Sequence, residues 1–127
     1  MQGDSALGHA LRIQELAAEG GFDWPDTRGP LAKVKEELAE VEREEGSGKR
    51  EALEDEIGDL LFAVVNLARK LGVDPGAALE RANEKFKGRF AKVERLAEER
   101  GMELGKVSLE ELDKLWDEVK DRQRRSG

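Results

Sequence analysis

Acidic residues at helical spacing are the side chains in this sequence that could do chemistry. Glu37 and Glu40 lie three residues apart in one helical pattern, and Glu56 and Asp59 repeat that spacing in the next. Residues three apart share a helix face, so two helices folded back on each other would bring the four carboxylates together. At an effective dielectric constant near 20, two like charges about 4 Å apart repel by about 4 kcal/mol. The pattern therefore predicts a bound cation, and carboxylate oxygens suit Mg²⁺ or, alternatively, Mn²⁺.

Other charged residues extend this hypothesis to a phosphate-handling enzyme. Lys85 and Arg89 lie four apart at the edge of an apolar stripe, where they would clamp phosphate oxygens or simply extend into solvent. Trp116 and Lys120 are also four apart, and the tryptophan either packs in the core or meets a nucleotide. The acidic row that includes Glu37 and Glu40, taken alone, is more typical of a solvated face.

The composition favours a small helical protein. The chain has 127 residues, of which 38% are hydrophobic and 40% charged, and helix-forming residues dominate. A net charge of −7 makes non-specific binding to nucleic acid or to a membrane surface unfavourable. We find no signal-peptide pattern, no cysteine and no apolar run approaching the about 20 residues of a membrane span. We therefore expect a cytoplasmic protein.

Apolar periodicity and capping residues predict an all-α fold of about five helices. The expected helices cover residues 5–19, from 25–30 to 45, 49–71, 75–100 and 108–121. Asp4 or Ser5 would cap the first helix, Asp74 the fourth, and Ser108 with Glu111 the last. We expect a single domain over 1–127, with an N-terminal helix and loop at 1–22, a core at 23–121 and a frayed tail at 122–127.

The third helical pattern bears on assembly. Residues 57–68 are apolar on almost every side, with Asp59 and Asn66 as the exceptions, so this helix is expected to be buried. Phe62 and Val65 lie away from the main apolar stripe, and one neighbouring hairpin cannot cover both sides. We therefore expect a core four-helix bundle completed by oligomerisation, as a homodimer or homotetramer.

The loop at residues 21–26 carries two aromatic side chains, Phe22 and Trp24. One interpretation is that they plug the end of the bundle. The other is that Trp24 or Asp23 lies near a ligand.

The acidic motifs resemble those of a known family. The segments EExxE at residues 36–40 and ExxD at 56–59 are similar to the signature of the all-α, MazG-like nucleoside triphosphate pyrophosphohydrolases. The segments IGDLLFAVVNLARKLG, ANEKFKGRF and LDKLWDEVK also resemble MazG enzymes, and the order of the blocks matches over nearly the whole chain. The chain is most similar to the second, C-terminal domain of the tandem members.

The resemblance implies helical bundles that assemble as dimers or larger oligomers. It also implies Mg²⁺-dependent hydrolysis of nucleoside triphosphates to the monophosphate and pyrophosphate, with water attacking the α-phosphorus. It assigns Glu37, Glu40, Glu56 and Asp59 as metal ligands, and Glu36 as the residue that completes the acidic motif. Phosphate contacts would come from Lys33, Lys85 and Arg89, and nucleotide contacts from Trp116 and Lys120.

Two other interpretations stay open. One is a non-enzymatic helical oligomerisation module whose acidic rows only aid solubility. The other is a related enzyme of the same superfamily that acts on dUTP or phosphoribosyl-ATP.

Overall fold

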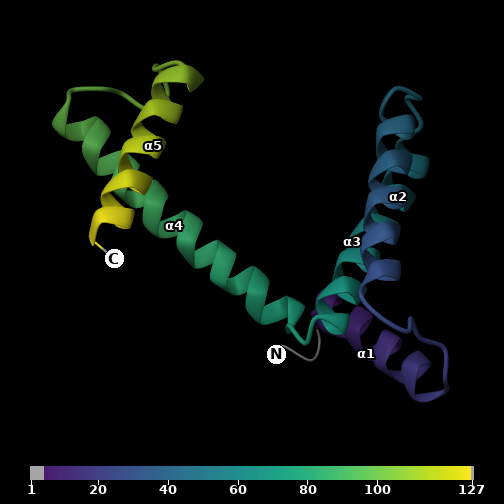
Figure 1. Ribbon diagram of the computed structural model, residues 1–127. Helices are drawn as coiled ribbons and strands as arrows, with labels where there is room; N and C mark the ends of the chain where they lie inside the picture. The colour runs from purple at the N-terminus through teal and green to yellow at the C-terminus, as the bar shows by residue number, and fades with distance from the viewer. Residues whose placement is uncertain (1–4, 127) are drawn as a thin grey trace. The chain divides into compact units, whose positions relative to one another are not determined.

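The computed structural model describes residues 5–126, which form five α-helices and contain no strand (Figure 1). The all-α prediction is confirmed. The helices are α1 (Ala6–Glu19), α2 (Arg28–Glu45), α3 (Arg50–Lys70), α4 (Pro75–Glu99) and α5 (Leu109–Ser126). None of these five is both long enough and apolar enough to cross a membrane.

The chain divides into two compact units. The first unit, Met1–Ala78, contains α1 to α3, and the second unit, Leu79–Gly127, contains most of α4 and all of α5. Each unit has its own packing and is described separately.

The first unit is built on a helical hairpin. Helices α2 and α3 lie side by side, and α1 packs against α3 (Figure 1). The turn between α2 and α3 contains Gly48 at φ +73°, a left-handed conformation that favours glycine. The buried side chains are few. They include Gln14 from α1, Pro30 and Glu37 from α2, and Ala63 and Val65 from α3.

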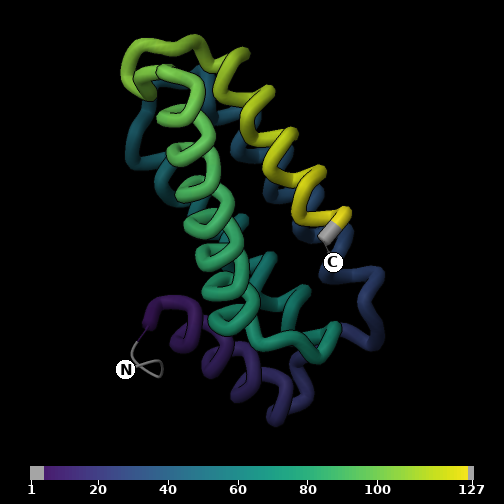
Figure 2. Tube along the Cα trace, turned by 90° about the vertical axis from the view of Figure 1, so that its left-hand side faces the viewer, coloured from purple at the N-terminus to yellow at the C-terminus, as the bar shows by residue number. Residues whose placement is uncertain are grey.

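The second unit is a pair of helices held by one apolar cluster. Helix α5 returns beside α4 after the loop at residues 100–108 (Figure 2). The seam repeats at intervals of three and four residues, as expected for packed helices. Its buried members are Val93, Leu96, Ala97, Leu115 and Val119.

Local capping residues begin these helices as the sequence predicts. The Ser5 hydroxyl accepts a hydrogen bond from the Gly8 amide at 3.0 Å, and the Ser108 hydroxyl accepts one from the Glu111 amide at 3.1 Å. The Asp74 carboxylate accepts from the Gly76 amide at 3.0 Å. Asp4, the alternative cap of α1, lies outside the described residues.

Two expectations, on Phe22 and on the C-terminal tail, need correction. Helix α3 is packed by α1 and α2 within its unit, and some of its apolar side chains are exposed, as expected for a helix that one neighbouring hairpin cannot cover. Leu61 is 54% exposed and Phe62 44%. Phe22 is 84% exposed and does not plug the helices. Helix α5 continues through Ser126, so residues 122–126 of the expected tail are helical.

Candidate active site

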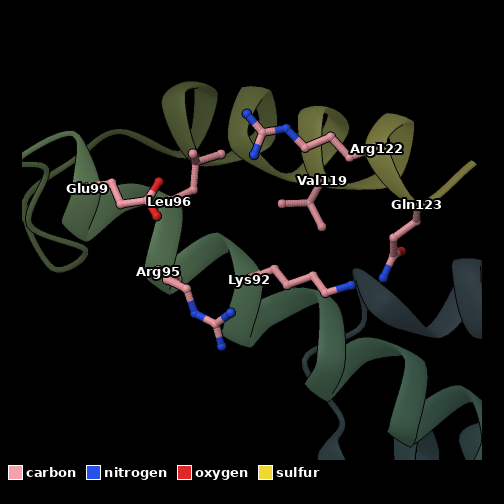
Figure 3. Close-up of a pocket in the computed structure, with 7 residues that line it drawn as sticks. All are labelled: Lys92, Arg95, Leu96, Glu99, Val119, Arg122 and Gln123. Carbon is pink, nitrogen blue, oxygen red and sulfur yellow. The ribbon is translucent and has the colours of Figure 1, made fainter. Parts of the chain in front are cut away.

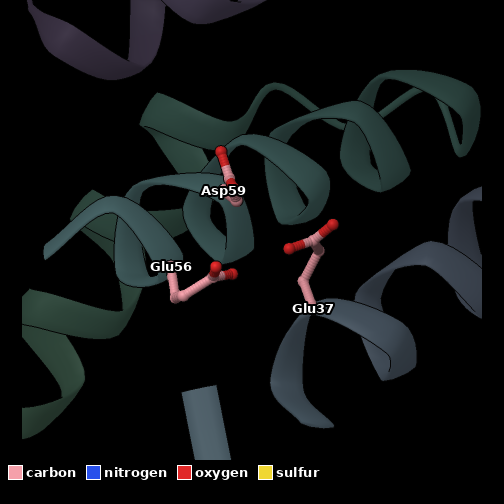
Figure 4. Close-up of side chains that lie close together, drawn as sticks. All are labelled: Glu37, Glu56 and Asp59. Carbon is pink, nitrogen blue, oxygen red and sulfur yellow. The ribbon is translucent and has the colours of Figure 1, made fainter. Parts of the chain in front are cut away.

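Three carboxylates from α2 and α3 converge in the first unit. Glu37 reaches from α2 toward the turn of α3 that carries Glu56 and Asp59 (Figure 4). One oxygen from each of the three groups lies within 4.8 Å of the other two. The hairpin makes this possible, because the i, i+3 pair on α3 meets one turn of α2. The arrangement is a set of hard oxygen donors drawn from two packed helices.

Glu37 is the most enclosed member of the cluster. The residue is 8% exposed, and its Oε1 lies 3.2 Å from the Lys33 ammonium. The same ammonium lies 3.0 Å from Glu36 Oε2, whose side chain is 59% exposed. These two acids raise the pKa of Lys33, so the lysine stays charged beside the site. Lys33 therefore offsets part of the negative charge on the α2 side.

Glu40 is not one of the three convergent acids, although its motif position predicts a place among them. Its carboxylate forms an ion pair with Arg43, one turn further along α2. Its charge still acts on the cluster, because it is one of the acids that raise the pKa of Glu56. The structure thus brings together Glu37, Glu56 and Asp59, with Glu40 beside them.

The surroundings of Glu56 disfavour the ionised form of its carboxyl group. Partial burial raises the pKa of this carboxyl group, and the charges of Glu40, Asp59, Glu37 and Glu44 raise it further. A divalent cation bound to these oxygens would reverse that effect, because it adds positive charge where four acids crowd a fifth. The donor chemistry and the crowding fit Mg²⁺ or Mn²⁺.

The cations expected to contact phosphate lie mostly in the second unit. Lys85 is exposed on α4, and Arg89 donates through Nε to Gln123 Oε1 at 3.0 Å. Trp116 is half-buried, with its ring centroid 5.2 Å from that of Phe86, and Lys120 is half-buried one turn further along α5. The packing of Trp116 in this unit accords with the core interpretation.

A groove runs between α4 and α5 in the second unit, with a volume of about 590 Å³ (Figure 3). Leu96 and Val119 supply apolar lining, and Gln123, the partner of Arg89, also borders the groove. The charged lining residues are Lys92, Arg95, Arg122 and Glu99. Because Arg122 forms an ion pair with Glu118 at 3.0 Å, part of this positive charge is already neutralised.

A second cavity, of about 500 Å³, lies in the first unit between α1, α3 and the loop that joins α1 to α2. Its apolar wall includes Ile13, Phe22, Trp24 and Phe62. Gln14 and Asn66 also line it, and so do Asp23 and Arg69. This volume is in the range typical of small-molecule sites. The cavity shares α3 with the acidic cluster.

Sequence reasoning missed Gln14, although a signal was present. The apolar stripe of α1 runs through Leu7, Ala10, Leu11 and Ala17, and Gln14 occupies the position where the next apolar residue should be. The residue is 5% exposed, and its Nε2 donates to the Phe62 carbonyl at 2.9 Å. A buried glutamine on an apolar face is therefore the feature to look for.

The loop from α1 to α2 is tied to the end of α3. Both terminal guanidinium nitrogens of Arg69 donate to the Asp23 carboxylate, and Lys70 donates to the Trp24 carbonyl at 2.8 Å. The hydrogen bonds from Arg69 hold the pKa of Asp23 far below its usual range. Arg69 Nε also donates to Asn66 Oδ1 at 3.0 Å, so this network orients a residue of the cavity wall. The loop wall is thus fixed by ion pairs.

Comparisons with known proteins identify the family that this chain matches. Residues 28–94 match the family described as the MazG nucleotide pyrophosphohydrolase domain. The chain is 49% identical over 115 residues to the nucleoside triphosphate pyrophosphohydrolase/pyrophosphatase MazG of Thermotoga maritima, and 48% identical over 118 residues to the nucleoside triphosphate pyrophosphohydrolase of Escherichia coli K12. Each alignment covers 91% of this chain and 44% of the relative, so the chain spans less than half the length of these curated proteins. It is also 50% identical over 74 residues to the uncharacterized protein YabN of Bacillus subtilis, which covers 58% of this chain and 15% of YabN.

Proposed function

This chain belongs to the MazG nucleotide pyrophosphohydrolase family, and from that premise we propose that it hydrolyses nucleoside triphosphates to the monophosphate and pyrophosphate with Mg²⁺. The observation that carries the proposal is the approach of three carboxylates, from two helices, to within 4.8 Å. The curated relatives from Thermotoga maritima and Escherichia coli carry the corresponding activity in their names.

The acidic residues form the metal-binding part of the proposed site. Glu37, Glu56 and Asp59 bind the metal, and Glu40 either joins them or holds their surroundings negative. When Mg²⁺ is bound, it supplies positive charge against the triphosphate oxygens and lowers the pKa of a bound water. Glu36 lies next in sequence to Glu37 and shares its contact with Lys33, and we assign it the role of orienting the attacking water.

The basic residues hold the phosphates. The water attacks the α-phosphorus, the bond to the bridging oxygen breaks, and pyrophosphate leaves with that oxygen. Lys33 lies beside the acids, and Lys85 and Arg89 supply further positive charge for the departing phosphates. Trp116 and Lys120 contact the nucleotide. Because the family match runs over residues 28–94, across the boundary between the two units, we infer that both units serve one functional domain.

We further propose that the chain acts as a homodimer or homotetramer. Three large apolar residues that share one face of α3 are 41% to 54% exposed, namely Ile57, Leu61 and Val64. A contiguous apolar helix face of this kind is typical of an interface. A second copy of the chain would cover it.

The test is product analysis after incubation with a panel of ribo- and deoxyribonucleoside triphosphates, with and without Mg²⁺. We expect monophosphate and pyrophosphate, only with the metal. Diphosphate and orthophosphate would show attack at the γ-phosphorus and contradict the mechanism.

Glu56→Gln provides the site test, and Glu54→Gln, at an exposed position two residues earlier on α3, is the matched control. We expect the Glu56 variant to lose at least about a hundredfold in metal-dependent turnover with its helix content intact, because a ligand has been removed from the site. Equal turnover by the two variants would rule out a role for Glu56.

A further inference from the structure

Gln14, which lines the cavity between α1 and α3, has a buried polar atom with no hydrogen-bond partner in the part of the chain that the structure describes. Gln14 Oε1 has no hydrogen-bond partner among residues 5–126, and less than 1 Å² of its surface is accessible. Buried amide oxygens are nearly always paired, because an unpaired one keeps the full cost of its desolvation. A donor supplied by a ligand in the cavity would remove that cost.

The hydrogen bond made by Gln14 Nε2 sets the orientation of the whole amide group. Its Nε2 donates to the Phe62 carbonyl, so rotating the amide by half a turn would place two oxygens against each other. The group therefore meets a ligand as a hydrogen-bond acceptor. Phe62 itself lines the cavity, which places both partners of this hydrogen bond in the same wall.

The rest of the cavity suits a flat, apolar ring. Trp24, Phe22 and Phe62 are aromatic lining residues, and stacking on such side chains is the usual way that proteins hold a base. A ligand must shift the wall slightly to reach Gln14 Oε1. Phe22 is 84% exposed and is the lining residue with the least packing to hold it.

The acidic cluster and the cavity are separated along α3 by a distance that one nucleotide can span. Asp59 of the acidic cluster and Asn66 of the cavity wall are seven residues apart, which is two turns on one face and about 10 Å along the helix. Over such a length a ribose joins a base to its α-phosphate. Both sites lie in the first unit, so their relation does not depend on the second.

We propose that this cavity holds the base of the substrate, and that the unpaired Oε1 of Gln14 selects bases with an amino group at C6 of a purine or C4 of a pyrimidine. Guanine carries a carbonyl oxygen at C6 and is not selected. This inference rests on the proposed function. An amino group projects from the ring edge and can reach a recessed acceptor. In uracil and thymine the ring N–H lies between two carbonyl oxygens, which would repel Gln14 Oε1. Adenine and cytosine are the expected bases.

The test is binding of triphosphates that cannot be cleaved, because their α–β bridge is a methylene group. Calorimetry with Mg²⁺ compares the adenosine analogue with its purine riboside counterpart, and the cytidine analogue with its pyrimidin-2-one counterpart. Each pair differs only by the amino group. We expect wild type to bind the amino member at least about tenfold more tightly in one pair or both. Equal affinities within both pairs would overturn the inference, even if Gln14→Leu cannot be prepared.

The variant Gln14→Leu tests whether Gln14 causes the difference in affinity within each pair. This variant keeps the approximate size of the side chain and removes the acceptor, so the difference within each pair should disappear. A difference that persists in Gln14→Leu would show that another group reads the amino group, and the assignment to Gln14 would be wrong. Tryptophan fluorescence gives a second readout, because a base in the cavity should quench emission in wild type and cause less quenching in Trp24→Phe.

Hydrolysis is measured separately on the natural triphosphates. If the analogues bind with the expected pattern but no triphosphate is cleaved, the proposed function fails and the cavity assignment stands. If triphosphates are cleaved without any preference that depends on Gln14, the proposed function stands and the inference fails. Absence of both binding and cleavage would refute both.

Discussion

The folded structure places the Glu56 carboxyl group where its ionised form is disfavoured. Partial burial and the neighbouring acids raise its pKa above the ordinary value for glutamate. A raised pKa in the folded state means that the fold binds a proton more tightly than the unfolded chain does. The ionised group therefore lowers the stability of the metal-free protein as the pH rises through the pKa range, and this penalty is absent at a pH below the ordinary glutamate pKa.

Because ionised Glu56 lowers the stability of the metal-free protein, its replacement by glutamine should raise that stability. In metal-free buffer at pH 7 the variant should melt at a higher temperature than wild type, and the difference should shrink as the pH is lowered below the range of glutamate titration. Mg²⁺ should raise the melting temperature of wild type more than that of the variant. Calorimetric melting with and without Mg²⁺ measures both effects. A variant that is less stable than wild type in metal-free buffer at pH 7 would mean that Glu56 has a structural role.

At the scale of elements, the loop between α1 and α2 forms a fixed wall rather than a free connection. Asp23 is paired with Arg69 and Lys70, and the Trp24 ring lies directly over Gly29 at the start of α2. A Cβ added at Gly29 would lie 2.2 Å from Trp24 Cε3, far inside van der Waals contact. Gly29 is therefore the residue that permits the position of the tryptophan.

Gly29→Ala should displace Trp24 and destabilise the first unit by about 1–3 kcal/mol, the usual cost of overpacking. Denaturant unfolding measures the free energy, and tryptophan emission reports the changed environment of the ring. Gly58→Ala is the matched control, because a Cβ at this α3 position meets nothing within 4 Å. The control should be neutral or more stable by about 0.5–1 kcal/mol, because alanine favours a helix. Equal effects of the two substitutions would show that the contact with Trp24 has no energetic weight.

At the scale of the whole molecule, charge and apolar surface are unevenly distributed. Acids outnumber bases in the first unit, which holds the carboxylate cluster, whereas the two nearly balance in the second. The exposed apolar face of α3 belongs to the acidic unit. A face of this kind is unfavourable in water, and its burial between two copies would offset that cost.

Leu61→Glu should therefore weaken self-association. The substitution puts a charge on Leu61, the most exposed of Ile57, Leu61 and Val64, and a charge buried at an interface is costly unless it is paired. Light scattering after size exclusion should give at least twice the chain mass for wild type and a smaller mass for the variant. Leu109→Glu, at a leucine that is 73% exposed at the start of α5, is the control and should leave the mass unchanged. A monomeric wild type would contradict the proposed assembly.

Features that depend on residues within one or two turns could be predicted from the sequence. Ser5, Asp74 and Ser108 act at helix starts as their positions indicate, because capping joins a side chain to an amide two or three residues later. The Glu56 and Asp59 pair of α3 also followed from spacing alone. The interpretation that Phe22 plugs the end of the bundle was wrong, since the side chain is exposed. Nothing in the local sequence shows whether an aromatic side chain in a loop will be packed against other residues.

The sequence by itself determined the helical class, the approximate helix bounds and the family, because periodicity and short motifs are local properties of the chain. Only the tertiary structure decided that Glu37 comes within 4.8 Å of Glu56 and Asp59 while Glu40 pairs with Arg43, that Arg69 holds Asp23, and that Gln14 lines a cavity. These features join side chains from different helices. Their approach depends on how the helices pack and rotate against each other, which spacing along one helix does not specify.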